Sequence, residues 1–97
     1  MPEYVRVATF EADEAALDAM VSEINSHSGP PEGVPGKAIT VLADRSAGKV
    51  RIVVRFGSEE DLRKGSAVLD GMSPPSDTAL RRVSVESYEV VLDRQAL

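Results

Sequence analysis

Four segments of the chain alternate between apolar and polar positions, which is typical of β-strands with one buried side. They span residues 3–10, 37–44, 50–56 and about 80–93. In the first segment Val5 and Val7 point to one side, while Tyr4 and Arg6 point to the other. Gly48 lies in the short loop between the second and third segments and can adopt a positive φ. The pattern therefore predicts four strands, with the middle two joined as a hairpin.

Two further segments repeat apolar residues every three or four positions, as amphipathic helices do. The first begins at Asp13, a capping residue, and its apolar positions are Leu17, Met20, Val21 and Ile24. The second begins at Ser58, three residues before Asp61, a spacing that resembles a capping box. Its apolar positions are Leu62, Leu69 and Met72, with Gly65 as a close-packing position. The proline pairs Pro30–Pro31 and Pro74–Pro75 predict where the two helices end.

The elements follow one another as β-α-β-β-α-β. Two right-handed βαβ crossovers of this kind give a four-stranded antiparallel sheet in the order 4-1-3-2, with both helices on one face. The expected fold class is α+β, a ferredoxin-like single domain that spans residues 1–97. The apolar positions of the last strand change parity near Glu86 and Ser87, which predicts a β-bulge there.

The sheet face opposite the helices is expected to stay partly apolar, because both sides of the first and third strands carry valine. Soluble proteins rarely leave such a patch exposed unless it forms an interface. A second copy of the chain, laid face to face by a two-fold axis, is the simplest cover. The sequence therefore predicts a homodimer, with the long last strand as an arm that reaches the other subunit.

The amino-acid composition limits the kinds of catalytic and metal site that the chain can form. The chain has no cysteine, no tryptophan and one histidine, so disulfides, thiolate catalysis and Cys- or His-rich metal sites are not expected. A net charge of -5 disfavours nucleic-acid binding. No apolar run is long enough to cross a bilayer, and residues 1–3 lack the features of a signal peptide. We expect a cytoplasmic protein without cofactor, metal, nucleic-acid partner or membrane association.

The element order, the length and the bent last strand resemble the dimeric α/β-barrel superfamily, in particular proteins similar to antibiotic-biosynthesis monooxygenases. Two proline-containing segments, Gly29–Pro35 and Met72–Pro75, look like those of an uncharacterised bacterial subgroup. The resemblance implies a pocket between sheet and helices in each subunit. It also implies small-molecule chemistry there, including cofactor-free oxygenation of polyketide-like aromatic compounds. The chain lacks the tryptophan that the haem-degrading and quinone-forming branches use.

Five side chains are candidates for a site at the end of the sheet where the first strand begins. His27 and Arg55 are the catalytic candidates, and Tyr4, Arg6 and Tyr88 are the substrate-binding candidates. His27 suits a general base because its ordinary pKa lies near neutrality, but a histidine in the last helical turn also stabilises the helix dipole. Arg6 and Arg55 are interpreted as outward-facing neighbours. They would hold a ligand oxygen, or would pair with Glu86 or Glu89 at the dimer interface. The tyrosines would orient a ligand or serve as rim residues.

Two functions therefore remain open. The first is a monooxygenase-like enzyme without metal or prosthetic group that acts on a small aromatic or polyketide-like compound. The second is a non-catalytic small-molecule-binding or structural homodimer. An enclosed cavity of roughly 300 Å³ with converging polar groups would favour a ligand site, whereas a filled interior would favour the structural role.

Overall fold

The computed structural model describes residues 2–27, 29, 33–71 and 81–95. Its elements occur in the expected order: β1 (Tyr4–Glu11), α1 (Glu14–Asn25), β2 (Gly36–Asp44), β3 (Lys49–Phe56), α2 (Glu59–Asp70) and β4 (Arg81–Glu89). The predicted positions of Pro30–Pro31, Pro74–Pro75 and Met72 lie outside the described residues.

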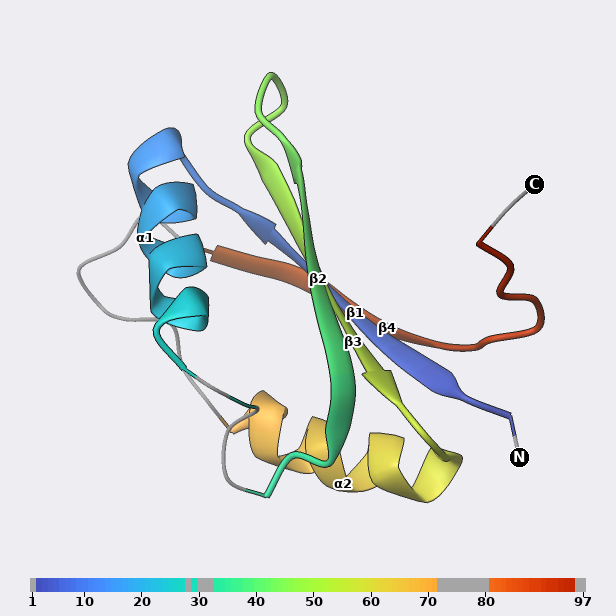
Figure 1. Cartoon of the computed structure of the whole chain (residues 1–97). Helices are drawn as coiled ribbons and strands as arrows, with labels where there is room; N and C mark the ends of the chain where they lie inside the picture. Colours follow the sequence, from blue (N-terminus) through green and yellow to red (C-terminus); the bar gives the residue numbers. More distant parts are fainter. Residues whose placement is uncertain (1, 28, 30–32, 72–80, 96–97) are drawn as a thin grey trace.

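The strands form one antiparallel sheet in the order β2-β3-β1-β4, which is the predicted order counted from the opposite edge. Gly48 has a φ of 66° in the β2–β3 hairpin, as its position in the loop predicted. Both helices lie on the same side of the sheet, α1 beside it and α2 across its lower end (Figure 1). This arrangement confirms the α+β, ferredoxin-like fold class.

Both helices begin at the capping residues that the sequence indicated. The Asp13 carboxylate accepts a hydrogen bond of 2.7 Å from the Ala16 N–H, and the Ser58 hydroxyl accepts one of 3.1 Å from the Asp61 N–H. Each cap satisfies a backbone donor that the first helical turn leaves without a partner.

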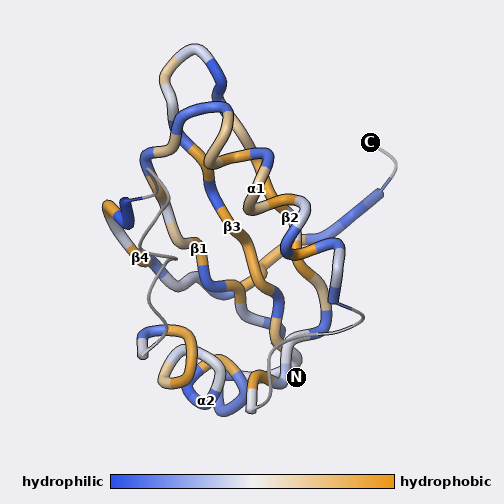
Figure 2. The backbone as a smooth tube through the Cα atoms, turned by 90° about the vertical axis from the view of Figure 1, so that its left-hand side faces the viewer, coloured by the Kyte–Doolittle hydropathy of each residue, from blue (hydrophilic) through white to orange (hydrophobic). Residues whose placement is uncertain are grey.

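The core consists of two separate clusters, one under each helix. Under α1 the buried members are Ala12, Ala16, Leu17 and Val50. Under α2 they are Val34, Val54, Phe56 and Leu62. Figure 2 shows the two helices well apart, with β1 and β3 running between them. Phe56 is fully buried, and the absence of a side chain at Gly65 lets α2 approach its ring.

The strand register defines two faces of the sheet. We call the side that packs on the helices the helix face; from β1 and β3 it carries Tyr4, Arg6, Ala8, Phe10, Val50, Ile52, Val54 and Phe56. We call the other side the open face; from the same strands it carries Val5, Val7, Thr9, Glu11, Lys49, Arg51, Val53 and Arg55. No described helix covers the open face (Figure 1).

The β-bulge of the last strand lies at Val83, so the predicted position near Glu86 and Ser87 is wrong. Thr9 of β1 pairs with Ser84 and the next residue, Phe10, pairs with Arg82, which leaves Val83 without an opposite residue. The pairing through Glu86 and Ser87 is continuous. The apolar pattern changes parity there for another reason: β4 is an edge strand that presents apolar residues to both faces, with Val85 on the helix face and Tyr88 on the open face.

The strand also ends earlier than expected, at Glu89. One more backbone hydrogen bond, 2.8 Å from the Val90 N–H to the Glu3 carbonyl, continues the pairing with β1. Beyond it the chain leaves the sheet, and the side chains of Val91 and Leu92 are 85% and 77% exposed. The C-terminal segment lies on the side away from the helices (Figure 1).

Candidate functional site

The five predicted site residues do not form a single site, because the register divides them between the two faces. Tyr4 and Arg6 lie on the helix face, whereas Arg55 and Tyr88 flank Val5 on the open face. The interpretation of Arg6 and Arg55 as neighbours on one face is therefore wrong, since Arg6 pairs with Val54. The prediction that Tyr4, Arg55 and Tyr88 gather at the same end of the sheet is confirmed.

Arg6 is the most unusual polar residue of the helix face, because it is only 4% exposed. Its Nη2 donates a hydrogen bond of 2.7 Å to Oδ1 of Asp70, the last residue of α2. The Asp70 side chain is 56% exposed, and Nη1 of Arg82 lies 4.0 Å from the same oxygen. The Arg6 Nε–H has no hydrogen-bond partner in the part of the chain that the structure describes. Leaving a buried donor unpaired costs about 1–3 kcal/mol, which sets this side chain apart from an ordinary ion pair.

The surroundings of Arg6 on the helix face combine small apolar groups with one hydroxyl. Ser87 pairs with Arg6 across β1 and β4, and Ala8 pairs with Val85 in the next helix-face row. Ala8 is 1% exposed, while Val85 is 37% exposed. The guanidinium therefore lies next to apolar surface of which the β4 side is partly open.

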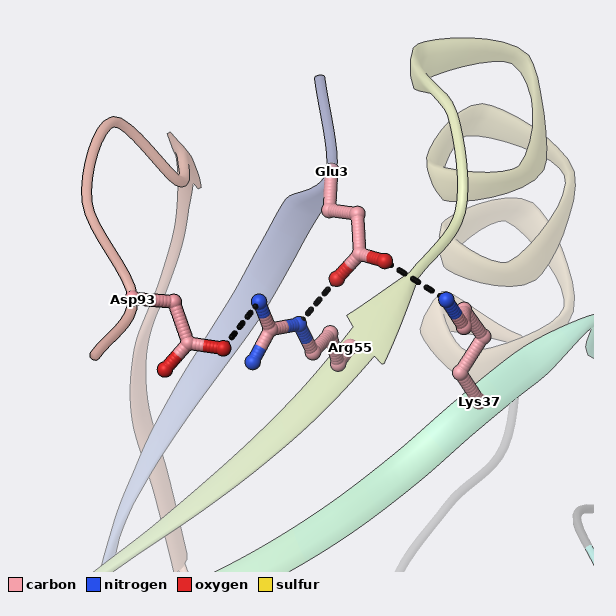
Figure 3. Close-up of polar contacts among 4 residues, drawn as sticks. All are labelled: Glu3, Lys37, Arg55 and Asp93. Atoms are coloured by element: carbon pink, nitrogen blue, oxygen red, sulfur yellow. Dashed lines mark hydrogen bonds and ion pairs between the residues drawn. The ribbon is translucent and has the colours of Figure 1, made fainter. Parts of the chain in front are cut away.

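Arg55, by contrast, is engaged in an ion-pair network at the edge of the open face. Its Nε donates to Glu3, whose other oxygen accepts from Lys37 at 2.5 Å, and its Nη2 lies 3.0 Å from an oxygen of Asp93 (Figure 3). The hydrogen bonds from Lys37 and then Arg55 hold the pKa of Glu3 below its ordinary value. Hydrogen bonding to Glu3 in turn raises the pKa of Arg55. The network joins the residue before β1, together with β2 and β3, to the C-terminal segment, so Arg55 acts as a structural link between these parts of the chain.

His27 belongs neither to the surroundings of Arg6 nor to the ion-pair network of Arg55. Its side chain is 63% exposed, and Nε2 lies 3.3 Å from Oε1 of Glu23, one turn earlier on the same helix. This position agrees with the alternative interpretation, in which the imidazole stabilises the C-terminal end of α1. The structure brings no second predicted site residue into contact with His27 among the described residues.

The two tyrosines have different surroundings. Tyr4 packs against the α2 cluster, where burial and then the negative charges of Glu59 and Glu89 raise the pKa of its phenol. Tyr88 is 49% exposed and donates a hydrogen bond of 2.8 Å to Glu86, which raises the pKa of its phenol. Tyr88 is thus a partly exposed residue of the open face, as the rim interpretation predicted.

The open face has an apolar centre with charged residues beside it. Val5, Val7 and Val53 lie side by side on adjacent strands and are only half-buried. Leu42 on β2 is 52% exposed and extends this apolar surface toward one edge, as Tyr88 does toward the other. The prediction that the side opposite the helices stays partly apolar is confirmed, although only β3 carries valines on both sides: both valines of β1 lie on the open face.

Sequence reasoning missed the partners that define the Arg6 and Arg55 environments, namely Asp70, Arg82, Glu3 and Asp93. The sequence does contain a signal for the Arg6–Asp70 pair. Arg6 shares its parity with Ala8 and Phe10, so a charge occupies a position on the side of β1 that the helices cover. A buried charge needs a partner, and a carboxylate on the helix that covers this side is the partner to expect.

A shallow hollow of about 260 Å³ lies elsewhere, between the start of α1 and the β2–β3 hairpin. Its polar lining includes Asp13, Glu14, Asp44, Arg45 and Lys49, and it contains none of the predicted site residues. Arg45 lies within 3.8 Å of carboxylate oxygens of Glu14 and Asp18, so the charges around this hollow largely compensate one another.

Comparison with known proteins identifies no relative: no family model, curated protein or solved structure matches the chain. Within residues 2–27, 29, 33–71 and 81–95, no group of three or more His, Asp or Glu side chains is arranged to hold a metal ion. None of the helices in that part of the chain combines the length and apolarity that a membrane span requires.

Proposed function

We propose that this protein is a non-catalytic homodimer that binds a small molecule, with the open face as the dimer interface and the helix face as the ligand side. The observation that carries this proposal is the apolar centre of the open face, formed by Val5, Val7 and Val53 without a covering helix. A contiguous apolar surface of this kind favours association over exposure to water. Association through this face keeps the buried Arg6, which lies on the helix face, outside the dimer interface.

Charges beside the apolar centre support a symmetric pairing. Arg51 lies on the β3 side and Glu86 on the β4 side, and neither forms an ion pair among the described residues. A two-fold axis that runs between β1 and β3, parallel to the strands, places β4 of one subunit over the β2–β3 half of its partner. Glu86 of each subunit then approaches Arg51 of the other, which supplies electrostatic complementarity at both ends.

The enzymatic alternative, a monooxygenase-like reaction without metal or prosthetic group, is supported by the resemblance alone. Arg55 is engaged with Glu3 and Asp93, and His27 is exposed beside Glu23. Neither catalytic candidate faces the other, so no observation among the described residues favours catalysis over binding.

Two matched substitutions on β2 test the interface. Leu42 and Ile39 are 52% and 48% exposed on the same edge strand, but Leu42 lies on the open face and Ile39 on the helix face. Light scattering at low micromolar concentration should show the parent protein at about twice 10.4 kDa. We expect Leu42→Glu to shift it toward the monomer and Ile39→Glu to leave the dimer intact, with far-UV circular dichroism as the control for folding. A monomeric parent protein, or equal effects of the two substitutions, would show that the open face is not the interface.

A further inference from the structure

Two guanidinium groups approach a single carboxylate oxygen on the helix face. Oδ1 of Asp70 lies 2.7 Å from Arg6 Nη2 and 4.0 Å from Arg82 Nη1. Among the described residues, the ion pairs at this oxygen bring together two positive charges and one negative charge, so these three side chains carry an excess positive charge. An environment with this excess attracts a second anion.

The hydrogen bonding of Arg6 indicates the shape of that anion. The Nε–H and one Nη2–H project from the same edge of a guanidinium and together match the two oxygens of a carboxylate. Asp70 occupies Nη2 with one oxygen, whereas the buried Nε–H has no partner among the described residues. The edge that favours a planar, two-oxygen acceptor is therefore only half used.

The residues beside this edge indicate the body of the ligand. Ala8 and Val85 are neighbours of Arg6 on the helix face and offer apolar contacts, and the Ser87 hydroxyl lies at the position paired with Arg6. Val85 is partly exposed, and so is the Asp70 carboxylate. A small acid with an apolar body would contact this surface while its carboxylate met the guanidinium groups.

We infer that Arg6 and Arg82 bind the carboxylate of a small, largely apolar organic acid, and that Asp70 is an internal competitor for the same position. The ligand carboxylate pairs with both Nε and Nη2 of Arg6, and the half-exposed Asp70 side chain turns toward solvent. This inference rests on the small-molecule half of the proposed function and is independent of the dimer.

A purely structural role for the Arg6–Asp70 ion pair leads to a different expectation. In that case Asp70 ties α2 to β1, and removing its charge only weakens the fold. If Asp70 competes with a ligand, removing its charge strengthens carboxylate binding even though it weakens the fold. The substitution Asp70→Asn therefore separates the two roles by the direction of the change in affinity.

The experiment titrates the full-length protein with benzoate and, in parallel, with benzamide, a neutral molecule of nearly the same shape. Binding is followed by nuclear magnetic resonance, using the Nε–H signal of Arg6 together with the backbone amides. The variants are Asp70→Asn, Arg6→Lys and Arg82→Gln. Arg63→Gln is the control, because Arg63 lies on α2 but is exposed and pairs only with Glu59 among the described residues. Backbone spectra of each variant report whether it is folded.

We expect benzoate to shift the Arg6 Nε–H signal and to bind at least about tenfold more tightly than benzamide. Asp70→Asn should tighten benzoate binding by roughly threefold or more, and Arg6→Lys should weaken it by about tenfold, since lysine keeps the charge but loses the two-donor edge. Arg82→Gln should weaken it less, and Arg63→Gln should have no effect. Asp70→Asn, which alters a half-exposed residue, keeps the test valid if Arg6→Lys does not fold.

The outcomes distinguish this inference from the proposed function. If benzoate and benzamide bind equally well and Asp70→Asn changes neither affinity, the protein binds small molecules but the carboxylate site is wrong. If Asp70→Asn weakens benzoate binding, the competition is refuted and Asp70 is a structural partner of Arg6. If neither probe binds, the carboxylate site is refuted, and a dimer in light scattering shows that the interface still holds. If a broader set of neutral and cationic aromatic compounds also fails to bind, the small-molecule function itself is refuted.

Discussion

Replacement of Gly65 by alanine tests the packing of α2 on the sheet. Gly65 lies inside α2 and is buried against the Phe56 ring. A Cβ at this position would overlap the edge of that ring, with Phe56 Cζ only 2.8 Å away, and would touch Val34 Cγ1 at 3.4 Å. Phe56 is 0% exposed, and its neighbours Val54 and Leu62 are buried with it. The ring therefore has little room to move.

The expected effect is the difference between two opposing contributions. Alanine is a better helix former than glycine, which by itself would raise the free energy of unfolding by about 1 kcal/mol. Forcing an extra methyl group into a packed core costs about 1–3 kcal/mol, and here the contact with the ring is closer than any relaxed Cβ contact. Because this contact is so close, we take the upper part of that range, about 2–3 kcal/mol, and expect Gly65→Ala to destabilise the protein by about 1–2 kcal/mol net, or to lower Tm by roughly 4–16 °C for a domain of this size.

Urea unfolding followed by far-UV circular dichroism measures this change, because the chain has no tryptophan for fluorescence. Ala67→Gly is the matched control: Ala67 is exposed on the same helix, so the substitution measures helix propensity without a packing change. Ala67→Gly should cost about 1 kcal/mol. If Gly65→Ala stabilises the protein by the same amount, helix propensity decides the outcome and the close packing of α2 on Phe56 is refuted.

Two other predictions concern α1 and the ion-pair network. Leu17 is 4% exposed, whereas Val21 on the same helix is 37% exposed. Leu17→Ala should therefore lower the free energy of unfolding, measured with urea, by about 2–4 kcal/mol, and Val21→Ala should lower it by less than about 1 kcal/mol. Equal costs would contradict the observed orientation of α1 on the sheet. The folded-state pKa of Glu3 lies below its ordinary value, so the stabilisation from its carboxylate is present above about pH 4.5 and is lost as the pH falls through the folded-state pKa. Glu3→Gln should therefore lower the free energy of unfolding near neutral pH, and below about pH 4.5 this free energy should fall less steeply with decreasing pH than in the parent protein. Urea unfolding at a series of pH values measures the slope, and an unchanged slope would contradict the role of Lys37 and Arg55 as partners of Glu3.

The fold could be predicted from the sequence because local and long-range signals agree in it. Asp13 and Ser58 mark the helix starts through side-chain caps that form within the first turn. Gly48 marks the hairpin through its positive φ. The strand order and the placement of both helices on one side then follow from the order of the elements together with right-handed crossovers, a handedness that is nearly invariant and does not depend on particular side chains.

The details of β4 could not be predicted, because an edge strand with two partly exposed faces has a weak register signal. Val83 sits in the bulge, while Val85 and Tyr88 lie on opposite faces of an otherwise regular strand. A change of parity in an apolar pattern has two physical causes, an inserted residue or apolar side chains on both faces. Only the pairing with β1 distinguishes these causes, and that pairing depends on residues about eighty positions away in the sequence.

The candidate site could not be predicted for a related reason: the alternation of β1 assigns the side of each residue correctly, but the charge of Arg6 suggests the solvent side and its parity the buried side. Arg6 shares its side with Ala8, which is 1% exposed, and is itself buried. An arginine at such a position loses most of its hydration and is retained only where opposing charge compensates it. Asp70 supplies part of that compensation from the end of α2, and the unpaired Nε–H shows that hydrogen bonding among the described residues remains incomplete. Arg6 therefore differs from Arg55, which lies on the open face within reach of the Glu3 and Asp93 carboxylates.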